Sequence, residues 1–262
     1  MVSLLFAFVS GAVFGSFLNV LIVRIPKGIG VAFPASHCPA CKHPLKWWHN
    51  IPLLSWLLLK GRCAFCHEAI SPLYPMVELM TGLLFAVVSL KTGLGAQWLI
   101  ISLIFSLFLA LSLIDFRYFA VPDSLNFTAL GLALVLPIVE LGWEAVTGGV
   151  ESFSSYKEAL LSRFLDAAVM AAIFWLLGFG VKKLIGKEAL GEADIVIAAT
   201  MGAMLGFPLV LVAIYIAALL AIVPALIARG HMVPFVPFLA LGTWIAWIFE
   251  PIITAWLRGL YG

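Results

Sequence analysis

Apolar residues fall into long runs along this 262-residue chain, and short polar stretches separate the runs. A helix needs about 20 consecutive apolar residues to cross the hydrocarbon core of a bilayer. Runs near that length, or shorter where glycines interrupt them, cover residues 2–23, 73–90, 97–114, 124–141, 161–181, 194–205, 208–228 and 235–257. The pattern predicts an all-α polytopic membrane protein with about eight transmembrane helices. Seven or nine are also compatible, because the separation of two runs at Gly206 is weak.

The composition supports this class of protein. Hydrophobic residues make up 64% of the chain and charged residues 11%, whereas soluble domains average about 45–50% and about 25%. The net charge is only +2, and the basic residues are scattered over several loops. No basic patch forms in the sequence, so we expect membrane lipid and no nucleic acid among the partners.

The basic residues also predict the orientation in the membrane. The first run lacks a preceding basic segment and a small-residue cleavage site, so we expect a mature helix and not a signal peptide. If the amino terminus lies outside, loops 24–72, 115–123, 182–193 and 229–234 share one side, and they carry 11 of the 15 basic residues. The positive-inside rule then places these loops in the cytoplasm.

One of these loops, 24–72, is long and polar enough to form a separate small domain. It holds all four cysteines in two C-x-x-C pairs, namely Cys38, Cys41, Cys63 and Cys66. Two such pairs are typical of a structural Zn²⁺ site, in which four thiolates surround one metal. Disulfides or redox thiols are the alternative, but a reducing compartment favours zinc. We expect a zinc-ribbon-like domain with the metal as its main source of stability.

Two aspartates stand at the cytoplasmic edges of apolar runs, Asp115 after LSLI and Asp194 after GEA. A carboxylate at membrane depth is costly, by about 2.5–3.5 kcal/mol even on lenient insertion scales. Each acid taken alone has an ordinary interpretation, such as a pair between Asp115 and Arg117. Together they predict acid–base chemistry on a peptide.

Several ordered motifs resemble those of the type IV prepilin peptidases. They are GSFLNV at 15–20, CPAC at 38–41, NIPLLS at 50–55, Glu78, LID at 113–115 with PD at 122–123, GEAD at 191–194 and PFVPF at 234–238. The second aspartate motif of that family is usually G-x-G-D, whereas position 193 is alanine in this chain. The likeness covers nearly the whole sequence.

This resemblance implies an aspartyl endopeptidase of the bacterial inner membrane. Members remove the basic leader of type IV prepilins or of type II secretion pseudopilins at the cytoplasmic face. Members with the cysteine-bearing loop typically also methylate the new amino terminus with S-adenosylmethionine. The resemblance thus implies three segments: a first helix at 1–23, the zinc domain at 24–72 and a membrane-embedded protease at 73–262. The amino terminus would be periplasmic.

We hypothesise that Asp115 and Asp194 share one proton and activate a water molecule. Glu78 and Glu192 are candidates for contacts with leader lysines, and a pair between Glu78 and a base such as Arg24 is the alternative. No G-x-G-x-x-G motif follows a strand, so the residues themselves indicate no site for S-adenosylmethionine. A peptidase with only a structural zinc domain, a proton- or cation-coupled transporter and a membrane scaffold are the alternative functions.

Overall fold

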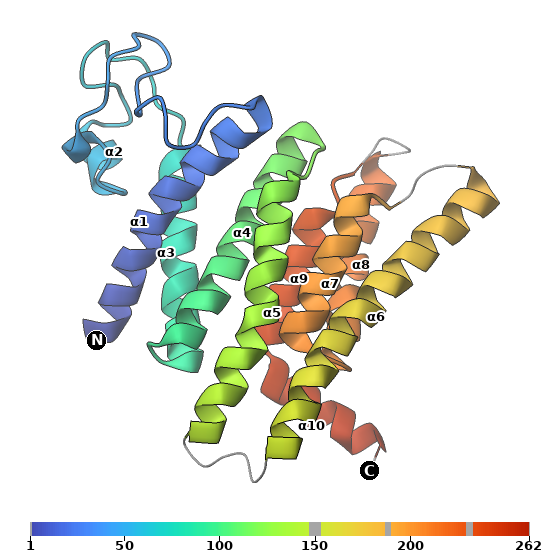
Figure 1. The fold of residues 1–262 in the computed structure, drawn as a ribbon. Helices are drawn as coiled ribbons and strands as arrows, with labels where there is room; N and C mark the ends of the chain where they lie inside the picture. The colour runs from blue at the N-terminus through green and yellow to red at the C-terminus, as the bar shows by residue number, and fades with distance from the viewer. Residues whose placement is uncertain (1, 147–152, 187–189, 229–232, 262) are drawn as a thin grey trace. The chain divides into compact units, whose positions relative to one another are not determined.

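The structure is a computed structural model. It describes residues 2–146, 153–186, 190–228 and 233–261. Parts of the predicted cytoplasmic loops 182–193 and 229–234 therefore lie outside the described residues. The described chain is helical and contains no β-strand beyond two isolated β-bridges. It divides into two compact units, Met1–Ser102 and Leu103–Gly262, and the boundary falls within helix α4 (Ala96–Tyr118) (Figure 1).

The first unit contains two apolar helices, α1 (Val2–Arg24) and α3 (Leu73–Thr92), which pack against each other. Glycines allow this close contact. A Cβ atom at Gly11 would lie 2.5 Å from the carbonyl oxygen of Thr81, and one at Gly15 would lie 2.8 Å from Cα of Glu78. Small residues at such positions are typical of helix pairs in membranes, where close packing takes the place of the hydrophobic effect.

Residues 25–72 connect α1 to α3 and form the segment that we call the cysteine module. It contains only short helices, namely η1 (Ile25–Lys27), η2 (Trp47–His49) and α2 (Leu54–Leu58). The Arg24 guanidinium donates to the carbonyl oxygens of Gly30, Val31 and Pro34. These bonds fold the start of the module back over the end of α1.

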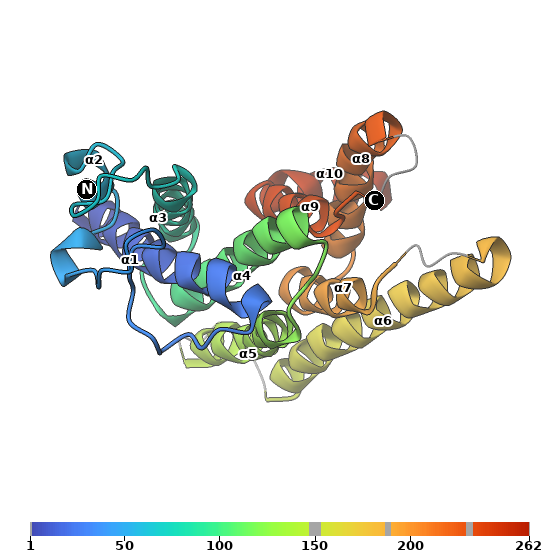
Figure 2. The same ribbon diagram turned by 90° about the horizontal axis from the view of Figure 1, so that it is seen from above.

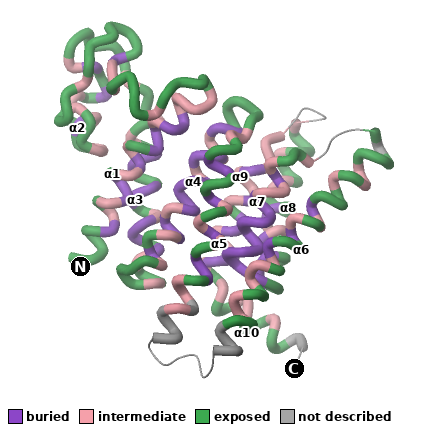
Figure 3. The backbone as a smooth tube through the Cα atoms, viewed as in Figure 1, coloured by how far each residue is buried: buried purple, intermediate pink, exposed green. Residues whose placement is uncertain are grey.

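The second unit is a helical bundle. Its helices after α4 are α5 (Asp123–Val146), α6 (Phe153–Ile185), α7 (Glu192–Leu205), α8 (Leu209–Ala228), α9 (Val236–Ile248) and α10 (Glu250–Tyr261). Helix α7 packs against α5, α6, α8 and α9, and Figure 2 shows it among them. Ten of its 14 residues are buried, and this region appears as the purple centre of the unit in Figure 3.

Small side chains allow α7 to occupy this crowded position. Ala198, Ala199, Gly202 and Ala203 are all buried. A Cβ atom at Gly202 would lie 2.6 Å from the carbonyl oxygen of Asp166 on α6. The backbones of α6 and α7 therefore approach as closely as their atoms allow.

All eight apolar runs are helical, but not all of them meet the criteria for a span. Among the described residues, six helices are long and apolar enough to cross a membrane, or up to seven if the bent pair α9 and α10 is one span. The predicted run at 194–205 forms α7, which is too short to be counted. The central prediction of eight spans thus exceeds this count, because apolarity in the sequence also marks a helix that other helices bury. Seven, which the pattern also allowed, equals the upper value.

The predicted last run, 235–257, is broken. Helix α9 ends at Ile248 and α10 begins at Glu250, and the two are bent by 75°. Pro251 explains the position of the break, because proline has no N–H to bond the carbonyl four residues earlier and is tolerated only in the first turn of a helix, which is where α10 places it.

Candidate active site and metal centre

Asp115 lies in the last turns of α4, and its side chain is buried with 7% of its surface exposed. The Val236 backbone N–H donates to its Oδ2 atom over 3.2 Å. Val236 is the first residue of α9, so a helix amino terminus, where N–H groups lack helical partners, faces the carboxylate. The alternative pair with Arg117 is not among the contacts of the described residues, and Arg117 is exposed.

Asp194 lies in the first turn of α7 and is 8% exposed. The Gly191 N–H donates to its Oδ2 atom over 2.9 Å. The carboxylate therefore helps to begin its own helix, which is a structural role that any proposal of catalysis must accommodate.

The structure brings the two predicted aspartates together. Their charges are close enough to interact, although the two residues are 79 positions apart along the chain. Each carboxylate is buried and accepts one backbone N–H. Two carboxyl groups whose charges interact in such surroundings resist double ionisation.

Asn126 contributes to this region and was not predicted from the sequence. It is fully buried in the first turns of α5, and its Nδ2 donates to the carbonyl oxygen of Ala193 over 3.0 Å. Its Oδ1 atom is buried without a hydrogen-bond partner among the described residues. A signal was present in the sequence, because Asn126 shares a helix face with the buried Ala129 and Ala133.

The four cysteines also come together. Their sulfur atoms all lie within 4.8 Å of one another, and Sγ of Cys38 is 3.8 Å from Sγ of Cys66. A tetrahedral Zn²⁺ site with Zn–S bonds of about 2.3 Å separates its sulfurs by about 3.8 Å. The cluster therefore fits one zinc ion.

The two C-x-x-C turns share one backbone geometry. In the first turn, the Cys38 N–H donates to the His43 carbonyl, and the Lys42 N–H donates to the Cys38 carbonyl. In the second turn, the Cys63 N–H donates to the Glu68 carbonyl, and the His67 N–H donates to the Cys63 carbonyl. Lys42 and His67 both adopt positive φ, 59° and 58°. This repeated local fold presents two thiols from each turn to one centre.

Nearby N–H groups prepare this centre for a cation. The backbone N–H groups of Cys66 and Phe65 lower the pKa of the Cys63 thiol to about 7. The Glu68 backbone acts in the same direction on Cys66, but desolvation and the neighbouring thiols outweigh it and raise the pKa of Cys66 to about 12. Four thiols so close together cannot all lose their protons unless a cation balances the charge.

Comparisons with known proteins identify the family of this chain. Residues 9–92 match the model of the bacterial peptidase A24 N-terminal domain, and residues 102–226 match that of the type IV leader peptidase family. A prepilin leader peptidase/N-methyltransferase of Stutzerimonas stutzeri is 33% identical over 95% of this chain and 91% of its own length. The chain belongs to the type IV leader peptidase family.

Other members are similarly close to this chain. The prepilin leader peptidase/N-methyltransferase of Klebsiella pneumoniae is 36% identical over 77% of this chain and 85% of its own length. That of Neisseria gonorrhoeae is 33% identical over 91% and 88%. No solved structure matches. The first family match includes the four cysteines, and the second includes Asp115 and Asp194.

The two predicted substrate contacts differ in their surroundings. Glu192 is the first residue of α7 and is exposed. Glu78 belongs to the first unit and is 8% exposed; its Oε2 atom accepts the Leu53 N–H over 2.8 Å. The alternative pair of Glu78 with Arg24 is not among the contacts of the described residues, in which Arg24 donates to backbone carbonyls of the cysteine module.

Proposed function

We propose that this chain is a membrane-embedded aspartyl endopeptidase with Asp115 and Asp194 as its catalytic pair. Family membership supports a peptidase. The observation that carries the proposal is that two buried carboxylates, at the end of α4 and the start of α7, lie close enough for their charges to interact. Among the contacts of the described residues, neither carboxylate pairs with a buried cationic side chain.

The proposed chemistry uses one proton between the two acids. One carboxylate, ionised, removes a proton from a water molecule, while the other, protonated, donates to the oxygen of the scissile carbonyl. The water attacks the carbonyl carbon, and no covalent intermediate forms with the enzyme. The pair titrates as a unit, so neither role is assigned to one residue. The N–H groups of Val236 and Gly191 orient the two carboxylates.

The proposed substrates are type IV prepilins and the related pseudopilins, which feed pilus or type II secretion assembly. The relatives named above are prepilin leader peptidases. A prepilin leader is basic and stays in the cytoplasm while the following helix lies in the bilayer. Cleavage between them requires acids at the cytoplasmic edge of the membrane, where the positive-inside rule places Asp115 and Asp194. The exposed Glu192 is suited to contact leader lysines.

The proposed location is the bacterial inner membrane, with a periplasmic amino terminus and the active site at the cytoplasmic face. In the part of the chain that the structure describes, six or up to seven apolar helices support a multi-pass membrane protein. The relatives are bacterial. The concentration of basic residues on the loops around both aspartates supports the orientation.

A second activity is proposed from the names of the relatives, which are both peptidases and N-methyltransferases. S-adenosylmethionine would supply the methyl group for the new amino terminus. We assign no residue of this chain to that cofactor. Zn²⁺ bound by Cys38, Cys41, Cys63 and Cys66 would hold the cysteine module together and take no part in the cleavage.

The decisive experiment is incubation of the detergent-purified protein with a prepilin, followed by mass analysis of the pilin. We expect a product that has lost its leader, and none with Asp115→Asn or Asp194→Asn. Asp123→Asn is the matched control, because Asp123 is an exposed acid near the same loop. Wild-type cleavage by either dyad variant would refute the mechanism. A labelled methyl donor added to the same reaction tests the second activity separately.

A further inference from the structure

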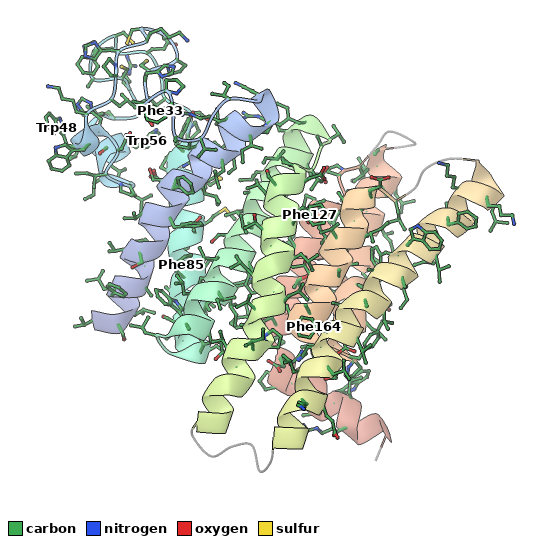
Figure 4. All side chains as sticks on the ribbon, in the orientation of Figure 1. Phe33, Trp48, Trp56, Phe85, Phe127 and Phe164 are labelled. Carbon is green, nitrogen blue, oxygen red and sulfur yellow. The ribbon has the colours of Figure 1, made fainter. Side chains whose placement is uncertain are left out.

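The cysteine module exposes an unusual number of large apolar side chains next to the membrane helices. Leu54, Leu57 and Leu58 of α2 are 57%, 62% and 81% exposed. Their spacing of three and four places them on one face of the helix, which we call the leucine face. Trp47 and Trp48, just before α2, are 76% and 46% exposed. Figure 4 shows Trp48 on the outer side of the module, pointing away from α1 and α3.

A buried hydrogen bond fixes the height of α2. Leu53, the residue before α2, donates its N–H to Glu78. Glu78 is five residues beyond Leu73, the start of α3, and five residues of helix rise about 7.5 Å. Helical side chains lean toward the amino terminus of their helix, so Leu53 lies beside the first turns of α3. Figure 1 draws α2 at the same height.

The backbone at this attachment is held in an unfavourable conformation. Leu53 has φ 62° and ψ −50°, and Leu54 N–H donates to the Pro52 carbonyl over 2.6 Å. These values describe a γ-turn with positive φ, which is rare and strained. The Leu53 N–H points at Glu78 because of this turn. The bond to a buried carboxylate offsets the strain and holds α2 beside α3.

The charges around the leucine face are those that an anionic lipid surface attracts. Residues 24–72 contain six basic side chains and one acidic side chain, Glu68. Lys46 and Lys60 flank the apolar stretch on both sides, and both are exposed. The Lys46 ammonium lies over the Trp48 ring at 5.0 Å from the centroid. Tryptophan, leucine and flanking lysine are the composition of segments that lie in the membrane interface.

We propose that α2 and the tryptophans before it form an interfacial anchor, which inserts the leucine face into the lipid headgroup region beside α3. The interface region on each side of the hydrocarbon core is about 5–7 Å deep, which matches the height at which Glu78 holds Leu53. The occupant of the leucine face is thus phospholipid, with anionic headgroups near Lys46 and Lys60. This anchor does not depend on the proposed catalytic reaction.

The test places a photoreactive benzoylphenylalanine at Leu57 or Leu58 in the full-length protein. The labelled proteins are reconstituted in vesicles of phosphatidylethanolamine and phosphatidylglycerol, irradiated and examined by mass spectrometry. We expect phospholipid adducts at both positions. The matched control is the same label at Ala40, which is exposed on the tip of a C-x-x-C turn, and we expect background adduct there. Zinc content confirms that each labelled module is folded.

Equal lipid adduct at Ala40 and Leu58 would overturn the proposal, because it would indicate random collision with the vesicle. An adduct with a second protein chain in place of lipid would overturn it as well. As a further test, Leu57→Gln with Leu58→Gln should reduce lipid labelling from position 54 to background. Ala40→Gln, the control substitution, should leave the lipid labelling from position 54 at its original level. Persistent labelling in the double variant would contradict insertion of the leucine face.

Discussion

The cysteine module and helix α7 are both short segments that carry functional candidates, but they are held in different ways. Within residues 25–72 the buried residues are Cys38, Ser55, Gly61 and Cys63. Helix α7 has ten buried residues among its 14. The module has almost no apolar core, and the proposed zinc ion and a few hydrogen bonds would hold it together. Helix α7 depends on the packing of its neighbours.

This difference predicts which substitutions should unfold a segment and which should affect only its chemistry. If zinc is bound as proposed, loss of a ligand in the module would remove the main interaction that orders about 50 residues, since small domains cannot bury enough apolar surface alone. In the second unit, the loss of one contact leaves many others. The chemistry of the second unit is nevertheless sensitive, because it depends on two carboxylates whose positions the packing determines.

The largest effect is expected from Cys63→Ser. The change removes one of four thiolates, and the module loses its bound zinc and its fold. Metal analysis should find zinc in the wild type and none in the variant, and protease should cut within 25–72. The helices outside the module should remain, so far-UV circular dichroism changes little. Ser71→Ala, at an exposed position near α3, is the control and should keep its zinc. Full zinc content in Cys63→Ser would contradict the four-cysteine site.

The next largest effect separates chemistry from stability. Asp115→Asn should reduce prepilin cleavage by about 10²–10⁴-fold, the usual contribution of a general acid or base. Zinc content should be unchanged, since the module belongs to the other unit. Quantitative cleavage assays and metal analysis on the same preparation would establish both results. A drop in zinc content equal to the drop in activity would show that the two units do not respond separately.

A smaller effect is expected where α1 meets α3. Gly11→Ala inserts a methyl group where Thr81 leaves no space, and such overpacking costs about 1–3 kcal/mol. Thermal unfolding in detergent should begin at a lower temperature. The matched change Gly131→Ala meets no atom within 4 Å and removes a helical glycine, so it should stabilise by up to about 1 kcal/mol. Equal behaviour of the two variants would contradict the close packing.

The smallest effect concerns Asn126. Asn126→Leu keeps the approximate volume but removes the donor to the Ala193 carbonyl, and a buried carbonyl without a partner costs about 1–3 kcal/mol. If that cost is expressed in the transition state, cleavage slows by about tenfold. The change should appear mainly in kcat, because the bond positions Asp194 and does not touch the substrate. Thr128→Val, on an exposed part of the same helix, is the control. A wild-type kcat in Asn126→Leu would exclude this positioning role.

Much of the fold was predictable because its signals are local. Apolar runs predicted the helices, and the spacing of Cys38, Cys41, Cys63 and Cys66 predicted a cluster that the structure contains. The family resemblance was also confirmed by the comparisons. The assignment of catalytic and substrate-binding residues, and the division at 1–23, 24–72 and 73–262, stay predictions. The weak points were the number of spans and the break at Pro251, since apolarity does not distinguish lipid from protein surroundings.

The sequence by itself determined which segments are helical and which chemical groups the chain possesses, because helix formation and metal-ligand chemistry depend on neighbouring residues. Only the tertiary structure decided which groups meet. It brings Asp115 near Asp194, 79 positions further along the chain. It also commits Glu78 to the Leu53 N–H and places Asn126 against Ala193. These contacts depend on how whole helices pack, and helix packing is set by the side chains of several helices at once.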